Sequence, residues 1–136
     1  MTRRAAVLSL VLVAPAVAQP ADPVSDFADA VFAATAAQAV ALACPTLSLD
    51  FVAASRLSDR TLGALGDAGV DPATLPDHPS DPYGAIAAAQ DAFRARHGLV
   101  DGADAGVVCA AGAAEIADRS GIGILLVEVE SEGASR

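Results

Sequence analysis

Apolar residues recur at the spacing of a helix face in four segments of the chain, which predicts four helices. The first runs from a cap at Ser25 or Asp26 to Cys44. Alanine dominates this segment and favours a helix, but each alanine buries little area. The larger side chains on its apolar stripe, which we expect to carry the packing, are Phe27, Val31 and Leu42.

The second predicted helix begins after a cap at Thr46, and its polar residues at 58–59 mark a place where it can break. Gly69 suits the left-handed position just past the helix, and Val70 would then touch Leu65. The apolar residues expected near one face are Leu47, Phe51, Ala54, Leu62 and Leu65.

A proline-rich connection precedes the third helix. Pro72 opens a short helical turn that ends at Pro76, and 75–82 has the composition of an exposed loop. The third helix has Asp81 as its cap and ends at Gly98. The residues along its inner side are Tyr83, Ile86, Gln90, Phe93 and His97.

The fourth predicted helix is capped by Asp101 or Asp104, reaches about Arg119 and is closed by Gly121. The residues on its inner side are Val108, Cys109, Gly112 and Ile116.

The last apolar segment, 122–129, fits two structures. Gly123 and an alternation near the end of the segment suggest a strand, whereas a short buried helix over 122–126 suits an all-helical core. We favour the helix and expect a flexible tail over 128–136. The predicted fold is therefore all-α, a small bundle of about four helices plus a short C-terminal segment, in one domain over 25–127.

Residues 1–18 have the three parts of a secretory signal peptide: a basic start, an apolar run and small residues before a cleavage site. We expect cleavage between Ala18 and Gln19, followed by a flexible lead over 19–24. The apolar run before Pro15 has about half of the roughly 20 residues that a membrane-spanning helix needs, so no membrane anchor should remain after cleavage. The sequence therefore predicts a periplasmic or secreted protein.

The two cysteines of an exported chain are normally paired. Cys44 ends the first predicted helix and Cys109 lies in the fourth, so a bond between them would tie the two halves of the domain together. Redox-active pairs usually lie close in sequence, as in a CxxC turn, and these two are far apart. We predict one structural disulfide.

The charge balance limits the partners. Without the signal segment the chain keeps 6 arginines and no lysine against 17 acidic residues, a formal charge of −11. Nucleic acid and anionic lipid are held by clustered basic residues, so neither is an expected partner. An acidic surface of this kind keeps a protein soluble, and the alternative is a specific basic partner or cation.

The spacings of known catalytic and metal sites are missing. Neither His78 nor His97 has the neighbours of a zinc site, and the chain has no GxSxG turn and no phosphate-binding glycine loop. We predict no catalytic residue, metal or cofactor, and we expect His97 to interact with the carbonyls at its helix end. The alternative for His78 is a loose surface metal site with Asp77 and Asp81.

Glu115 lies in a mostly apolar segment four residues before Arg119, which predicts an ion pair along one helix. The alternative is an enzyme or small-ligand site built from scattered residues. Those residues would be Tyr83, Arg94, His97 and Glu115.

Several short segments resemble an uncharacterised family of small exported alphaproteobacterial proteins, classed as a domain of unknown function. The resemblance covers about 26–126, and the segments that carry it are 43–46, 108–112, 115–117, 120–123, Leu125 and Leu126. Val108 stands where that pattern has an aromatic residue, and Ala113 where it has an arginine. The resemblance implies a periplasmic helical protein with its two cysteines paired and no activity.

These observations lead to three hypotheses. The first is a non-enzymatic periplasmic protein that binds a protein partner or client through its helical faces. The second is an acid-responsive periplasmic chaperone, because protonated carboxylates would reverse the net charge near pH 3 to 4. The third is a small-ligand carrier or an enzyme with a site that spacing does not reveal.

Overall fold

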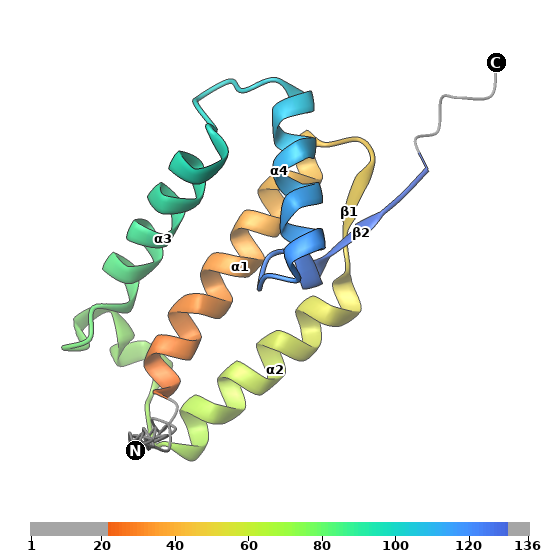
Figure 1. The fold of residues 1–136 in the computed structure, drawn as a ribbon. Helices are drawn as coiled ribbons and strands as arrows, with labels where there is room; N and C mark the ends of the chain where they lie inside the picture. Colours follow the sequence, from red (N-terminus) through yellow and green to blue (C-terminus); the bar gives the residue numbers. More distant parts are fainter. Residues whose placement is uncertain (1–21, 131–136) are drawn as a thin grey trace, which may run out of the picture.

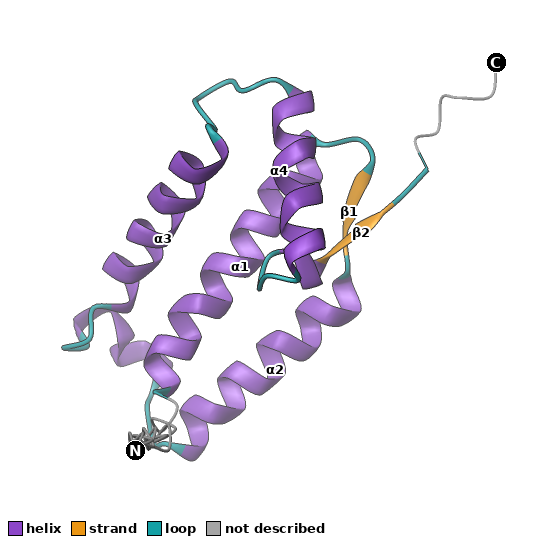
Figure 2. Cartoon of the chain, viewed as in Figure 1, coloured by secondary structure: helices purple, strands orange, loops and turns teal. Residues whose placement is uncertain are grey.

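The computed structural model describes residues 22–130, and four α-helices form most of this part of the chain (Figures 1 and 2). The helices are α1 (Pro23–Ala43), α2 (Phe51–Asp67), α3 (Pro82–His97) and α4 (Ala105–Asp118). Two 3₁₀ turns and two short strands complete it: η1 (Pro72–Asp77), η2 (Gly123–Leu125), β1 (Leu47–Leu49) and β2 (Leu126–Glu128). The predicted small helical bundle with one disulfide is confirmed.

Helix α1 is the centre of the bundle and contacts α2, α3 and α4 (Figure 1). Its buried residues are Val24, Ala28, Ala33, Ala36, Ala37 and Val40. The expectation that Leu42 helps to carry the packing was wrong, because its side chain is 82% exposed. Four of the six buried residues are alanines, so the face that α1 turns to its neighbours is made mostly of small side chains.

The same helix is the one described element long and apolar enough to span a membrane by length and composition alone. Its cap is Asp22, at least three residues before the predicted cap, because the Asp22 side chain accepts a hydrogen bond from the Val24 amide and the helix begins at Pro23. Val24 therefore belongs to the helix rather than to a flexible lead, and it packs with Leu65 and Leu75 in a small second core. The predicted signal peptide and the first half of the predicted lead, 19–21, lie outside the described residues.

The predicted start of the second helix was wrong. Leu47 belongs to β1, and α2 begins only after Asp50, whose carboxylate accepts hydrogen bonds from the amides of Val52 and Ala53. The helix then continues without a break through 58–59. Because the expected apolar face was drawn from Leu47, it was also misplaced: Phe51 is 75% exposed.

Strands β1 and β2 form an antiparallel ribbon in which Leu47 lies opposite Glu128 and Leu49 opposite Leu126. The favoured helix over 122–126 is therefore confirmed only as the single turn η2, and the strand alternative holds from Leu126 onward. Glu128, which was assigned to the tail, is part of β2, and 131–136 lie outside the described residues. Gly123 permits this path, since a Cβ there would collide with the Glu115 carbonyl.

The helix ends follow the predicted chemistry at most positions. Gly69 and Gly98 both have positive φ angles, and the Val70 amide donates to the Leu65 carbonyl over 2.9 Å. Two predicted ends were wrong. Arg119, with φ 50°, closes α4 in place of Gly121. The turn η1 continues through Pro76, which donates no amide, and is closed by the His78 amide bonded to the Leu75 carbonyl.

Candidate functional site

A groove of about 510 Å³ lies between α1 and α3 and is bounded by the segment 99–103 that leads into α4. Most of its wall is apolar and includes Phe32, Ala36, Ala39, Val40, Phe93 and Val108. Phe32 and Phe93 meet edge to face with their ring centroids 6.2 Å apart. The small alanines of α1 leave the space that forms the groove, since larger side chains there would fill it.

Charged groups lie at the edge of this groove. Arg94 and Asp101 form an ion pair of 2.5 Å, and both are exposed. Asp91 also lines the groove, and among residues 22–130 it has no ion-pair partner. The edge therefore has two carboxylates against one guanidinium.

Glu115 is the centre of a buried polar cluster between α3 and α4. Glu115 is only 3% exposed. Its Oε1 lies 2.7 Å from Nη2 of Arg96 and 2.6 Å from Nε2 of His97. Burial raises the pKa of Glu115, but hydrogen bonds from Ser120 and His97, together with the charge of Arg96, outweigh burial and lower the pKa below its ordinary value. The ionised carboxylate thus joins two helices.

The predicted ion pair between Glu115 and Arg119 was wrong. Arg119 adopts a left-handed conformation that ends α4, and the partners of Glu115 come from α3 instead. The ring of His97 also contacts Phe93, with centroids 4.9 Å apart, so it does not act mainly on the carbonyls at its helix end. Phe93 consequently links the groove to the Glu115 cluster.

The scattered residues expected to form an enzyme or ligand site are only partly brought together. His97 contacts Glu115, whereas Arg94 lies at the groove and pairs with Asp101. Tyr83 is exposed near the other end of α3, about 20 Å along the helix axis from His97. Arg96 is the residue that sequence reasoning missed, because no spacing rule connects it with Glu115.

The alternative metal site is not assembled. Nδ1 of His78 accepts a hydrogen bond from the Ser80 amide, and Asp81 accepts one from the Gly84 amide as the cap of α3. Between residues 22 and 130 no three His, Cys, Asp or Glu side chains form a group that could hold a metal ion.

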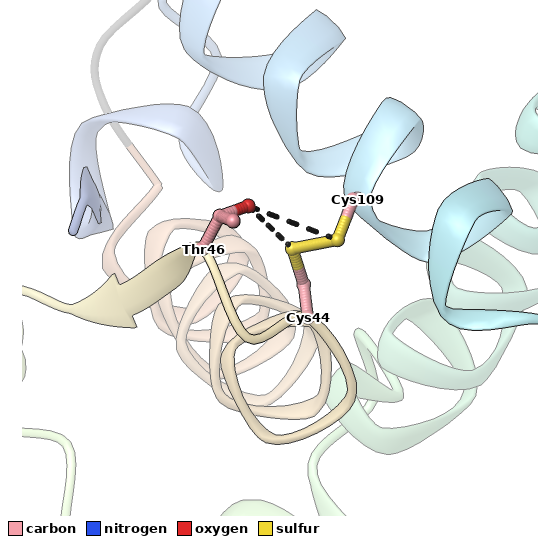
Figure 3. Close-up of a disulfide and its surroundings, with 3 residues drawn as sticks. All are labelled: Cys44, Thr46 and Cys109. Atoms are coloured by element: carbon pink, nitrogen blue, oxygen red, sulfur yellow. Dashed lines mark hydrogen bonds between the residues drawn. A yellow bond between two sulfur atoms is a disulfide. The ribbon is translucent and has the colours of Figure 1, made fainter. Parts of the chain in front are cut away.

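Cys44 and Cys109 are joined by a disulfide, as predicted, with their Cα atoms 5.1 Å apart (Figure 3). The bond fixes the end of α1 to the first half of α4. The Thr46 hydroxyl lies beside it, 3.3 Å from the sulfur of Cys44 and 3.9 Å from that of Cys109. Disulfides of this kind are typical of proteins in oxidising compartments.

A family model described as a family of unknown function, DUF5333, matches residues 19–127. The chain belongs to the DUF5333 family. The groove, the Glu115 cluster and the disulfide all lie within the DUF5333 region. No curated protein and no solved structure matches this DUF5333 chain.

Proposed function

We propose that this DUF5333 protein is a non-enzymatic binding protein that holds an apolar, basic segment of a partner polypeptide in the groove between α1 and α3. The groove itself carries the proposal. Its volume of about 510 Å³ and its mostly apolar wall are typical of binding sites, which combine an apolar surface with a few polar groups.

The surface around the groove favours a polypeptide over a small molecule. Val100 lines the groove and is 70% exposed, so apolar surface continues from the groove to the outside of the bundle. A small molecule would leave this surface in contact with water, whereas an extended segment can cover it.

Charge determines the kind of segment. Asp91 and Asp101 lie at the edge of the groove, and the chain as a whole has a formal charge of −9. Lysine or arginine residues next to the apolar side chains of the partner would meet these carboxylates, and complementary charge would also speed association. An acidic segment would be repelled.

A variant of Ala39 tests the groove. Ala39 is exposed and lines the groove, so Ala39→Phe should fill part of it without disturbing the core. We expect this variant to bind a fluorescein-labelled peptide of leucine and arginine at least tenfold more weakly than the wild type does, measured by fluorescence anisotropy.

The matched control is Ala88→Phe, which adds the same ring at an exposed position of α3 that does not line the groove. The Ala88→Phe variant should bind the leucine and arginine peptide as tightly as the wild type does. A peptide of leucine and glutamate should bind more weakly to the wild type and to the Ala88→Phe variant. Equal affinity of the Ala39→Phe and Ala88→Phe variants would contradict binding in the groove.

We further propose that the protein is exported to the periplasm and loses residues 1–18. The signal-like N-terminus and the disulfide support this location. Intact-mass measurement of the protein recovered from periplasm should give a chain that starts at Gln19 and has no free thiol. A chain recovered from cytoplasm with residues 1–18 retained would contradict export.

A second function, acid-dependent binding of unfolded clients, is favoured by the buried carboxylate of Glu115. Neutralising this group would remove its attraction to Arg96 and weaken the connection between α3 and α4. Since Phe93 lies between this cluster and the groove, movement of α3 would change the groove as well. This function requires that acid destabilise the fold through Glu115.

A further inference from the structure

The two sulfurs of the disulfide differ in their surroundings. Cys44 is 1% exposed, whereas Cys109 is half-buried and lines a second hollow of about 440 Å³. This hollow lies between α4 and the β1–β2 ribbon, and Thr46, Ala113 and Val129 also line it. Cys109 is therefore the more accessible cysteine of the pair and borders the hollow, while the surrounding core covers Cys44.

Thr46 is placed to assist when this bond breaks. Its hydroxyl lies 3.3 Å from the sulfur of Cys44, closer than to that of Cys109, and can donate a hydrogen bond to it (Figure 3). Cys44 follows the carboxyl end of α1, where the helix dipole disfavours a thiolate. The hydroxyl offsets that effect, and a better stabilised thiolate leaves faster in thiol–disulfide exchange.

We propose that the Cys44–Cys109 disulfide is a site of thiol–disulfide exchange with a dithiol protein, entered at Cys109 and assisted by the Thr46 hydroxyl. This role is independent of the groove between α1 and α3 and goes beyond the structural one.

The thiol–disulfide exchange proceeds in two steps. A thiolate of the partner attacks the sulfur of Cys109, a new S–S bond forms, and the Cys44–Cys109 bond breaks with its electron pair on Cys44. The second thiol of the partner loses its proton and attacks the partner's own sulfur in the mixed disulfide, which releases Cys109 as a thiolate. Both thiolates take protons from water. The chain gains two electrons and the partner is oxidised to a disulfide.

Trapping with glutathione identifies the attacked sulfur. The full folded protein is mixed with excess reduced glutathione, quenched with acid, alkylated with N-ethylmaleimide and mapped by peptide mass. We expect glutathione on Cys109 and the maleimide on Cys44. A thioredoxin-type protein whose second active-site cysteine is replaced by serine should be captured on the same residue.

The Thr46→Val variant tests whether the Thr46 hydroxyl speeds the exchange. It keeps the backbone carbonyl that accepts from the Val129 amide, and it removes the hydroxyl. We expect the exchange to slow at least fivefold in this variant. Thr35→Val is the control, because the Thr35 hydroxyl bonds to carbonyls of α1 away from the disulfide. Its exchange rate should match that of the wild type.

Three results would overturn the proposal: glutathione mainly on Cys44, an exchange rate in the Thr46→Val variant equal to that of the wild type, or thiol–disulfide exchange no faster than global unfolding. The rate of global unfolding is measured by hydrogen exchange of core amides under the same conditions. A rate well above global unfolding supports direct attack on the folded protein.

Discussion

Replacing both cysteines should cost this protein about 4 kcal/mol in free energy of unfolding, as expected for a crosslink between residues 65 apart in the sequence. The bond limits the freedom of the unfolded chain, and the Cys44→Ala, Cys109→Ala double variant lacks that limit. Urea denaturation followed by circular dichroism measures the loss directly.

Reductant supplies the matched control. Dithiothreitol should lower the stability of the wild type to about that of the double variant and leave the double variant unchanged. A loss below about 1 kcal/mol in the double variant would contradict this account, because residual structure in the unfolded chain would then have to replace the effect of the bond.

The disulfide contributes a large part of the free energy of unfolding because the hydrophobic core is modest. The buried side of α1 is mostly alanine, and α2 buries only Leu65. Domains of this size are stable by about 5 to 15 kcal/mol, so a crosslink worth about 4 kcal/mol is a substantial part of the total. The bond also lies where α1 and α4 meet, which the alanines alone would hold weakly.

Local chemistry made the helix ends predictable from sequence. The Asp81 cap and the left-handed glycine at Gly98 depend on a few neighbouring residues, and both have the predicted roles. The face that each helix buries depends on the whole bundle. Leu42 was expected inside and is exposed, because α1 approaches its neighbours through alanines whose small size gives no periodic signal.

The ribbon was predicted only in part, and the polar cluster was missed, for a related reason. The alternation near the end of 122–129 suggested a strand there, but β1 has only three residues and no strand pattern of its own, so its pairing with β2 across most of the sequence was not visible. The rule for helical ion pairs assigned Arg119 to Glu115, but the actual partners come from α3. The groove between α1 and α3 arises only once the helices are packed, although its residues are all visible in the sequence.

Replacing Glu115 with glutamine should lower the free energy of unfolding by about 2 kcal/mol at pH 7, the size expected for a hydrogen bond to a charged group. Glutamine keeps the shape of the side chain but lacks the charge that faces Arg96 and His97. The control is Glu128→Gln, which removes the same charge from an exposed position and should change stability by less than about 0.5 kcal/mol.

The pH dependence of this difference distinguishes charge from shape. The pKa of Glu115 is lowered in the folded protein, so its contribution is fully present above the ordinary pKa of about 4.3 and is lost as pH falls through the folded value. The gap between the wild type and the Glu115→Gln variant in urea denaturation should therefore narrow below about pH 4. A gap of equal size at pH 3 and pH 7 would mean that the amide disturbs packing, and acid-dependent client binding through Glu115 would lose its physical basis.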